Sequence, residues 1–163
     1  MAISLNTADV MSVSRYPIKT PNPSDTVDSI LKQLSEIENE IDSPQINAEM
    51  DELETGGVFF GRNTQKVMNI KLRDTKTSDL KKFGGIIYPV EFGNLVYLTK
   101  YEYLKSWFGF TSAGERDANI RKRLTTIDKY NEYLFTQTIT DWVFINLIKK
   151  NDPDVMENLP LYR

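Results

Sequence analysis

Residues 24–42, SDTVDSILKQLSEIENEID, contain the clearest pattern in the chain. Five aliphatic side chains recur there at spacings of three, four, three and four: Val27, Ile30, Leu34, Ile37 and Ile41. These spacings place all five on one stripe of an α-helix. The other faces carry six acidic side chains and one base, Lys32. A narrow apolar stripe with an acidic back suits a partner helix better than a broad core, so we predict that the five residues form an interface with a separate molecule.

The boundaries of this acidic helix are also predicted. Ser24 is placed to cap its first turn, and Pro44 biases Ser43 away from helical geometry and so ends it. A second short helix is predicted from Pro44 to Glu54, since proline is favoured at a first helical position. Its apolar face would be formed by Ile46, Met50 and Leu53.

Residues 1–23 are predicted to form an extended arm. Pro17, Pro21 and Pro23 do not fit a helix interior and favour extended backbone before them. The segment has more apolar side chains than a solvated linker, which indicates that it lies against its own domain or a neighbouring subunit. A frayed terminus is the alternative.

The middle of the chain reads as strands. Residues 57–61, GVFFG, precede a polar turn, and residues 66–73 alternate, with Met68, Ile70 and Leu72 on one side. A second hairpin follows Gly84-Gly85 and turns at Gly93-Asn94, in the residue order that a type II′ turn requires. Pairing Phe92 with Leu95 puts six apolar residues on one face: Ile86, Tyr88, Val90, Phe92, Leu95 and Tyr97. Pro89 predicts an edge or bulged strand.

The last third of the chain reads as helical. Thr99 and Glu102 have the spacing of a capping box for a short helix over residues 100–108, and Ser112 and Glu115 have the same spacing before a longer one. On the long helix, Ile120, Leu124, Ile127 and Leu134 recur at helical spacing, and Tyr130 and Tyr133 widen this apolar stripe. A break or kink is predicted at residues 136–140, which are rich in β-branched side chains. Residues 141–150, DWVFINLIKK, should be deeply buried, and an extended tail follows.

We therefore predict an α+β fold. A small antiparallel sheet of two hairpins would pack against the long C-terminal helical region, beside the extended arm and the acidic amphipathic helix. Three segments result: the arm (1–23), an acidic helical segment (24–55), and an α+β domain with an extended tail (56–163).

Composition excludes several chemistries. The 163 residues include no cysteine and no histidine, so disulfides, thiolate nucleophiles, Cys/His zinc sites and histidine-dependent triads are impossible. We expect no metal, no cofactor and no catalytic residue. Residues 24–55 hold ten acids and one base, whereas residues 56–110 hold nine bases and four acids. These segments would attract each other within the fold or between copies, or else form two ordinary solvated faces.

Two candidate catalytic or nucleotide sites are weak. The loop GFTSAG, residues 109–114, leads into a predicted helix N-terminus that could hold an anion, but it lacks the Lys-Ser/Thr pair of a phosphate loop. Glu91 and Glu102 are the only acids set among aromatic residues, which is the setting that a glycan hydrolase needs for its general acid. A small carboxylate-dependent glycan hydrolase is therefore a remaining alternative.

Nucleic-acid binding is the other alternative. A basic surface is predicted from Arg62, Lys66, Lys71, Arg73, Lys76, Lys81 and Lys82, beside Phe59 and Phe60. Basic charge interleaved with aromatic rings binds single strands, although the protein as a whole is acidic, with a pI near 5.1. On the long helix, Asn131 lies within the apolar pattern, where a polar residue can set the register of an oligomer or simply be solvated.

The function that we expect is a non-enzymatic structural or assembly subunit that oligomerises with other protein subunits, in part by coiled-coil contacts. In general character the chain is similar to small structural proteins of tailed-bacteriophage particles, such as connector, neck or baseplate subunits, although no motif identifies a family. No apolar run is long enough to span a bilayer and no secretion signal is evident, so we expect no membrane partner and a location in a virion or the cytoplasm.

Overall fold

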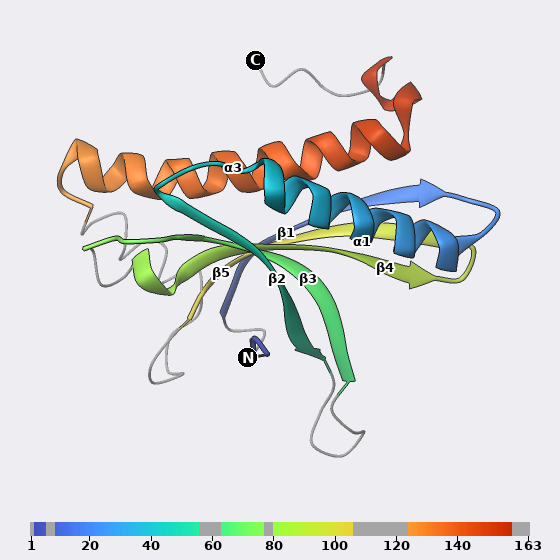
Figure 1. Ribbon diagram of the computed structural model, residues 1–163, viewed down its shortest axis with the longest axis horizontal. Coiled ribbons are helices and arrows are strands. Elements are labelled where there is room, and N and C mark those ends of the chain that lie inside the picture. The colour runs from blue at the N-terminus through green and yellow to red at the C-terminus, as the bar shows by residue number, and fades with distance from the viewer. Residues whose placement is uncertain (1, 6–8, 56–62, 77–79, 106–123, 158–163) are drawn as a thin grey trace.

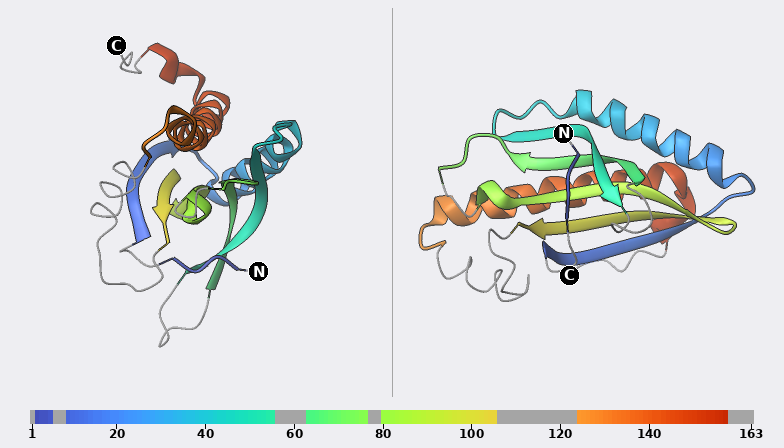
Figure 2. Two further views of the ribbon diagram at one scale, coloured as in Figure 1. Left: turned by 90° about the vertical axis from the view of Figure 1, so that its left-hand side faces the viewer. Right: turned by 90° about the horizontal axis from the view of Figure 1, so that it is seen from below.

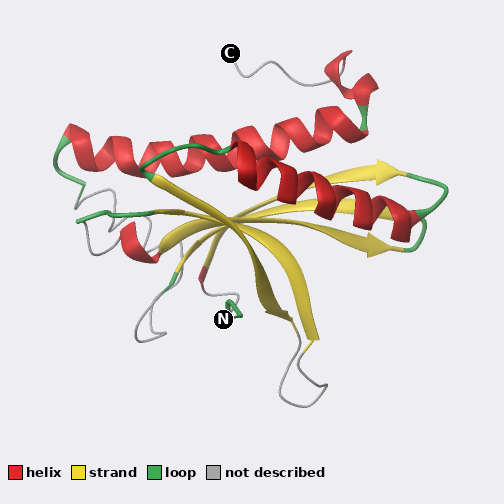
Figure 3. Ribbon diagram, viewed as in Figure 1, coloured by secondary structure: helices red, strands yellow, loops and turns green. Residues whose placement is uncertain are grey.

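A computed structural model of the chain describes residues 2–5, 9–55, 63–76, 80–105 and 124–157. Its centre is a five-stranded antiparallel sheet in the order β1-β5-β4-β3-β2. The strands are β1 (Val10–Lys19), β2 (Ile46–Thr55), β3 (Asn63–Leu72), β4 (Phe83–Phe92) and β5 (Leu95–Leu104). Helices α1 (Pro23–Glu40) and α3 (Ile127–Asn151) both lie on one side of this sheet (Figure 1, Figure 3). The α+β class predicted from the sequence is confirmed.

Two predicted elements are strands instead. The segment predicted as a helix from Pro44 to Glu54 contains β2, which pairs with β3 from Ile46↔Leu72 to Thr55↔Asn63. The predicted helix over residues 100–108 is wrong in its described part, because β5 continues to Leu104 and pairs with both β4 and β1. In both cases, pairing with a neighbouring strand outweighs the local helical pattern.

The predicted arm is part of the sheet. Val10–Lys19 forms the edge strand β1, paired along its length with β5. Ile3 forms a parallel bridge with Leu53 at the opposite edge, where its amide donates to the Glu52 carbonyl at 2.6 Å. The prediction that residues 1–23 form an arm outside the folded domain is therefore wrong. Contact with the chain's own domain or with a neighbouring subunit was predicted, and the described part of the segment contacts its own domain.

The central hairpin matches its prediction. Phe92 pairs with Leu95. Gly93 has φ +63°, whereas Asn94 does not have a positive φ, which excludes a type I′ turn and fits type II′. Pro89 lies in β4, which is an interior strand rather than an edge. However, β3 pairs with β4 only from Gly85 to Ile87, so Pro89 does not interrupt that ladder.

The core lies between the sheet and the two helices. Its residues come from all five strands, α1, α3 and the short 3₁₀ helix η3 (Pro153–Glu157), so all three predicted segments contribute to it. A smaller cluster lies on the far side of the sheet, where Ile3 packs with Leu53, Val67 and Ile86. A third cluster surrounds Phe83 and Tyr133, next to the 3₁₀ helix η2 (Leu80–Lys82). Figure 2 shows α3 as an outer layer with one side turned away from the sheet.

Candidate functional site

The side of α3 that faces away from the sheet exposes five large apolar side chains. Their exposed fractions are 74% for Ile127, 41% for Tyr130, 37% for Leu134, 46% for Trp142 and 39% for Ile145. At about 100° of rotation per residue, all five project within about 60° of one direction. We call these five residues the outer stripe. A single exposed apolar residue is ordinary, but several on one face form a patch of the kind that binds other molecules.

The inner side of α3 explains why this stripe remains outside. Tyr133, Thr136, Thr140, Val143 and Leu147 are buried against the sheet. The approach to β4 is very close, because a Cβ added to Gly85 would lie 2.5 Å from Thr140 Cγ2. The helix is therefore held by one face, and its second apolar face has no partner among the described residues.

A polar network fixes the rotation of α3 about its own axis. The Lys100 ammonium on β5 pairs with Glu102 Oε1 at 3.5 Å and with the carboxylate of Asp141 on α3. Gln137 Nε2 donates to Glu102 Oε2 at 3.0 Å, and the ammonium lies 5.9 Å from the centre of the Phe144 ring. Lys100 and Glu102 are buried, so their contact is shielded from water, whereas the Asp141 side chain on α3 is half exposed. Together with the Gln137 hydrogen bond, these contacts help to orient the helix on the sheet.

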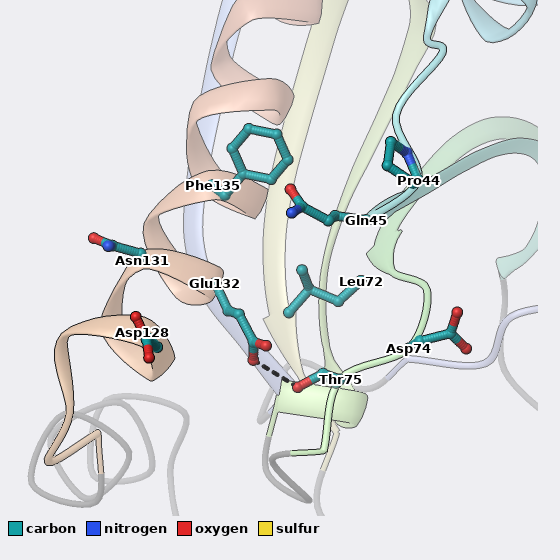
Figure 4. Close-up of a pocket in the computed structure, with 9 residues that line it drawn as sticks. All are labelled: Pro44, Gln45, Leu72, Asp74, Thr75, Asp128, Asn131, Glu132 and Phe135. Carbon is teal, nitrogen blue, oxygen red and sulfur yellow. Dashed lines mark hydrogen bonds between the residues drawn. The ribbon is translucent and has the colours of Figure 1, made fainter.

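A pocket of about 400 Å³ lies beside the first turns of α3 (Figure 4). Its lining includes three carboxylates, those of Asp74, Asp128 and Glu132, and Thr75 Oγ1 donates to Glu132 Oε2 at 2.8 Å. Asn131 also lines this pocket, and its side chain extends from the helix away from the sheet (Figure 4). In the part of the chain that the structure describes, no group of acidic side chains is arranged to hold a metal ion. The acidic lining favours a cationic group over a phosphate.

The face of the sheet opposite the helices carries a second surface, formed by β1, β5 and β4. Arg15 Nη2 donates to the Tyr101 hydroxyl at 3.4 Å, and the Tyr88 and Tyr101 rings lie 5.8 Å apart. Burial and the hydrogen bond with Tyr101 raise the pKa of Tyr88. Burial alone would raise the pKa of Tyr101, but hydrogen bonds with Tyr88 and Arg15 outweigh it and lower that pKa. The three side chains form one hydrogen-bonded group.

The same face ends in exposed aromatic side chains. Phe92 is 73% exposed and lies 6.4 Å from the Tyr97 ring, beside a pocket of about 240 Å³ that Arg15 also lines. The strand register puts two cations and no carboxylate on this part of the face. Its residues are Val13, Arg15, Pro17, Lys19, Tyr88, Val90, Phe92, Leu95, Tyr97, Thr99 and Tyr101. We call them the open sheet face.

The predicted interface on the acidic helix lies mainly inside the protein. Ile30, Leu34 and Ile37 are exposed by 0–1% and belong to the core with the sheet and α3, and Val27 and Ile41 are partly buried against the same core. The prediction that this stripe faces a separate molecule is wrong, because the sheet and α3 of the same chain cover it. The helix is capped at Asn22 with Pro23 in its first turn, rather than at Ser24.

The predicted basic surface is not assembled in the described part of the chain. Lys66 pairs across strands with acidic Glu52, whereas Lys71 points to the other face of the same strand. Arg73 Nη2 donates to the Ile46 carbonyl at 3.4 Å, and Lys81 and Lys82 lie on η2. Arg62, Phe59 and Phe60 lie outside the described residues.

The candidate acids do not come together. Glu91 on β4 pairs with Val96, and Glu102 on β5 pairs with Gly85. These two pairs are six residues apart along the strands, which corresponds to about 20 Å. A glycosidase pair needs a separation of roughly 5–10 Å. Glu91 instead accepts a hydrogen bond from Ser24 at 3.1 Å. The GFTSAG loop and the predicted capping box at Ser112 and Glu115 lie outside the described residues.

Sequence reasoning missed the outer stripe because α3 is apolar on two faces. Ile127, Tyr130 and Leu134 are predicted to share one apolar stripe with Tyr133. However, Tyr133 is buried with Thr136 against the sheet, and the other three are exposed. The predicted break at residues 136–140 is absent, since Thr136 and Thr140 lie within one continuous helix. Of the predicted buried segment 141–150, Trp142 and Ile145 are exposed. The nearly continuous apolar pattern of residues 141–150 was the available sign that more than one face of this helix is apolar.

Comparisons with known protein families, curated proteins and solved structures give no match to this chain. Within the described residues, neither helix is long and apolar enough to cross a membrane.

Proposed function

We propose that this chain is a non-enzymatic subunit of a larger protein assembly and that it binds other protein subunits through the outer stripe. The observation that carries the proposal is the alignment of Ile127, Tyr130, Leu134, Trp142 and Ile145 on one exposed face of α3. Exposed apolar patches of this kind are typical of protein–protein contacts, where tyrosine and tryptophan act as anchors.

The inner contacts of α3 support this assignment. The opposite face of the helix is packed on the sheet through Gly85, Thr140 and the Lys100 network, which holds the backbone of α3 in place. A preordered backbone loses less conformational entropy when a partner binds. We further assign the assembly to a tailed-bacteriophage particle of the connector, neck or baseplate type, on the general character of the sequence. Mass spectrometry of purified particles tests that assignment.

The decisive experiment is co-expression of the tagged chain with an untagged copy of itself and with the products of neighbouring genes. The wild type should recover a stoichiometric complex, and Leu134→Asp combined with Ile145→Asp should lose it while remaining folded by circular dichroism. Val13→Asp combined with Phe92→Asp is the matched control, because it places the same two charges at exposed apolar positions on the face of the sheet opposite the helices. A complex that survives the double change, or no complex with the wild type, would contradict the proposal.

A second candidate function is binding of single-stranded nucleic acid on the open sheet face. The observation that favours it is the juxtaposition of Arg15 and Lys19 with exposed Phe92 and half-buried Tyr97, without a carboxylate on that part of the face. Bases stack on aromatic rings while cations contact phosphates. Filter binding of a single-stranded oligonucleotide should weaken steeply with salt and in Phe92→Ala and Arg15→Gln. No binding at low salt would dismiss this candidate.

A further inference from the structure

We propose that the outer stripe binds a second copy of this chain, with the two α3 helices packed antiparallel about a twofold axis level with Thr136. This inference rests on the proposed function and names its partner. Closed twofold pairing requires one surface to be complementary to itself. The order of side chains along α3 meets that requirement.

The spacing of the exposed positions is that of a helix–helix seam. Starting at Ile127, steps of four and three alternate to Ile145 along the outward side of the helix. The positions are Ile127, Asn131, Leu134, Thr138, Asp141 and Ile145. This is the repeat by which two helices interdigitate over several turns. Tyr130 and Trp142 flank the seam on its two sides.

Reading the seam in reverse gives the same chemistry. In an antiparallel pair centred at residue 136, Ile127 lies opposite Ile145 of the second copy, and Leu134 lies opposite Thr138. Asn131 lies opposite Asp141, whose side chain is half exposed although it also pairs with Lys100. The Asn131 amide can donate to that carboxylate, so the two symmetric Asn131–Asp141 layers are matched and fix the register.

Charge at the helix ends also favours the antiparallel arrangement. The first turn of α3 carries Asp128, and the last turn carries Lys149 and Lys150. Side chains of a helix lean toward its N-terminus, so Lys149 of one copy leans toward Asp128 of the other, about 8 Å away along the axis. Antiparallel helix dipoles add to the attraction, whereas a parallel pair would set like charges side by side.

The exposed area fits a small, weak interface. The five residues of the outer stripe together expose on the order of 500 Å², below the roughly 800 Å² per partner of a standard interface. The patch is therefore as large as the largest that monomers usually expose.

Disulfide trapping tests this arrangement cleanly, because the chain has no cysteine of its own. Under mild oxidation Ile127→Cys combined with Ile145→Cys should give a covalent dimer. Ile127→Cys alone should not, since its two copies would lie about 27 Å apart. Phe92→Cys, at an equally exposed site, measures chance collision. Efficient trapping by Ile127→Cys alone, or no trapping above the Phe92→Cys level by the double variant, would overturn the proposal.

Sedimentation of the purified full chain provides the second measurement. The wild type should dimerise with rising concentration, Leu134→Asp should remain monomeric, and Thr138→Leu should lower the dissociation constant by about tenfold because it adds apolar contact in two symmetric layers. A wild type that stays monomeric while the Leu134-dependent complex with another protein still forms would overturn the self-pairing and leave the proposed function intact. If neither the dimer nor the complex with another protein forms, the self-pairing and the proposed function are both overturned.

Discussion

Adding a single methyl group at Gly85 is expected to destabilise the protein by about 1–3 kcal/mol, the usual cost of overpacking a core. The new Cβ would meet Thr140 Oγ1 and lie 2.5 Å from Thr140 Cγ2 and 3.0 Å from its Cβ. Thr140 has little freedom to move away, because it is 1% exposed and its hydroxyl donates to the Thr136 carbonyl at 2.8 Å. The new methyl group would therefore push β4 and α3 apart at this contact.

Urea unfolding followed by far-UV circular dichroism measures this cost. Gly85→Ala is compared with Thr140→Ala and with the double variant, in which the smaller side chain leaves room for the new methyl group. We expect the double variant to recover at least about 1 kcal/mol relative to the sum of the single changes, since the two residues are in contact. Gly93→Ala is the matched control. Its φ of +63° is strained for alanine, at about 1 kcal/mol, but no atom lies within 4 Å of the new Cβ.

The control should show no coupling to Thr140→Ala. A Gly85→Ala protein as stable as the wild type, or a double variant whose free energy of unfolding is only the sum of its parts, would refute the close approach. That approach determines which side of α3 is buried, and so a refutation would also remove the reason for the outer stripe being outside.

Three further outcomes are expected. Ile37→Ala should cost about 2–5 kcal/mol in urea unfolding, the range for a filled core position, while leaving association unchanged; a fully stable variant that fails to associate would restore the interface reading of α1. Lys100→Met should cost about 3–5 kcal/mol, because it leaves the buried Glu102 carboxylate without its cation; a neutral effect in the same assay would show that the network does not orient α3. A hydrogen bond to the Asp152 carboxylate, with burial, raises the pKa of Tyr16 from 10.0 to about 12, so the stabilisation is present below pH 10 and lost as the pH rises from 10 to 12. Tyr16→Phe should therefore flatten the decline of the urea midpoint over that range, and an unchanged slope would contradict this assignment.

The helical pattern of residues 24–42 identified α1 but not what covers it. The aliphatic residues from Val27 to Ile41 would have the same helical spacing whether the stripe packed against another molecule or against the chain's own sheet. What decides between them is the presence of β4 and of the inner face of α3 at the right distance, and these come from contacts far apart in the sequence. The sequence therefore predicts the element more securely than its partner.

Strand β2 shows why local patterns can mislead. Ile46, Met50 and Leu53 have helical spacing, and the acidic residues between them are acceptable on a helix surface. However, Ile46, Ala48 and Met50 also alternate, and the ladder with β3 supplies the backbone hydrogen bonds along the whole segment. The hairpin at Gly93 was predictable to its register, because glycine in the first turn position constrains the local geometry directly.

The composition of the outer stripe bears on how such a subunit would be used. In the twofold pair its seam has two isoleucine layers and two Asn131–Asp141 layers. Desolvating the polar layers offsets part of the gain from burying Ile127 and Ile145. Two isolated copies would then bind each other weakly, although the polar layers would still fix the register of the pair. Within an assembly that holds many copies close together, the effective concentration strengthens each such contact without any new surface. A weak but register-specific helix pair is therefore suited to a subunit that must first diffuse as a single chain and associate only where other contacts bring its copies together.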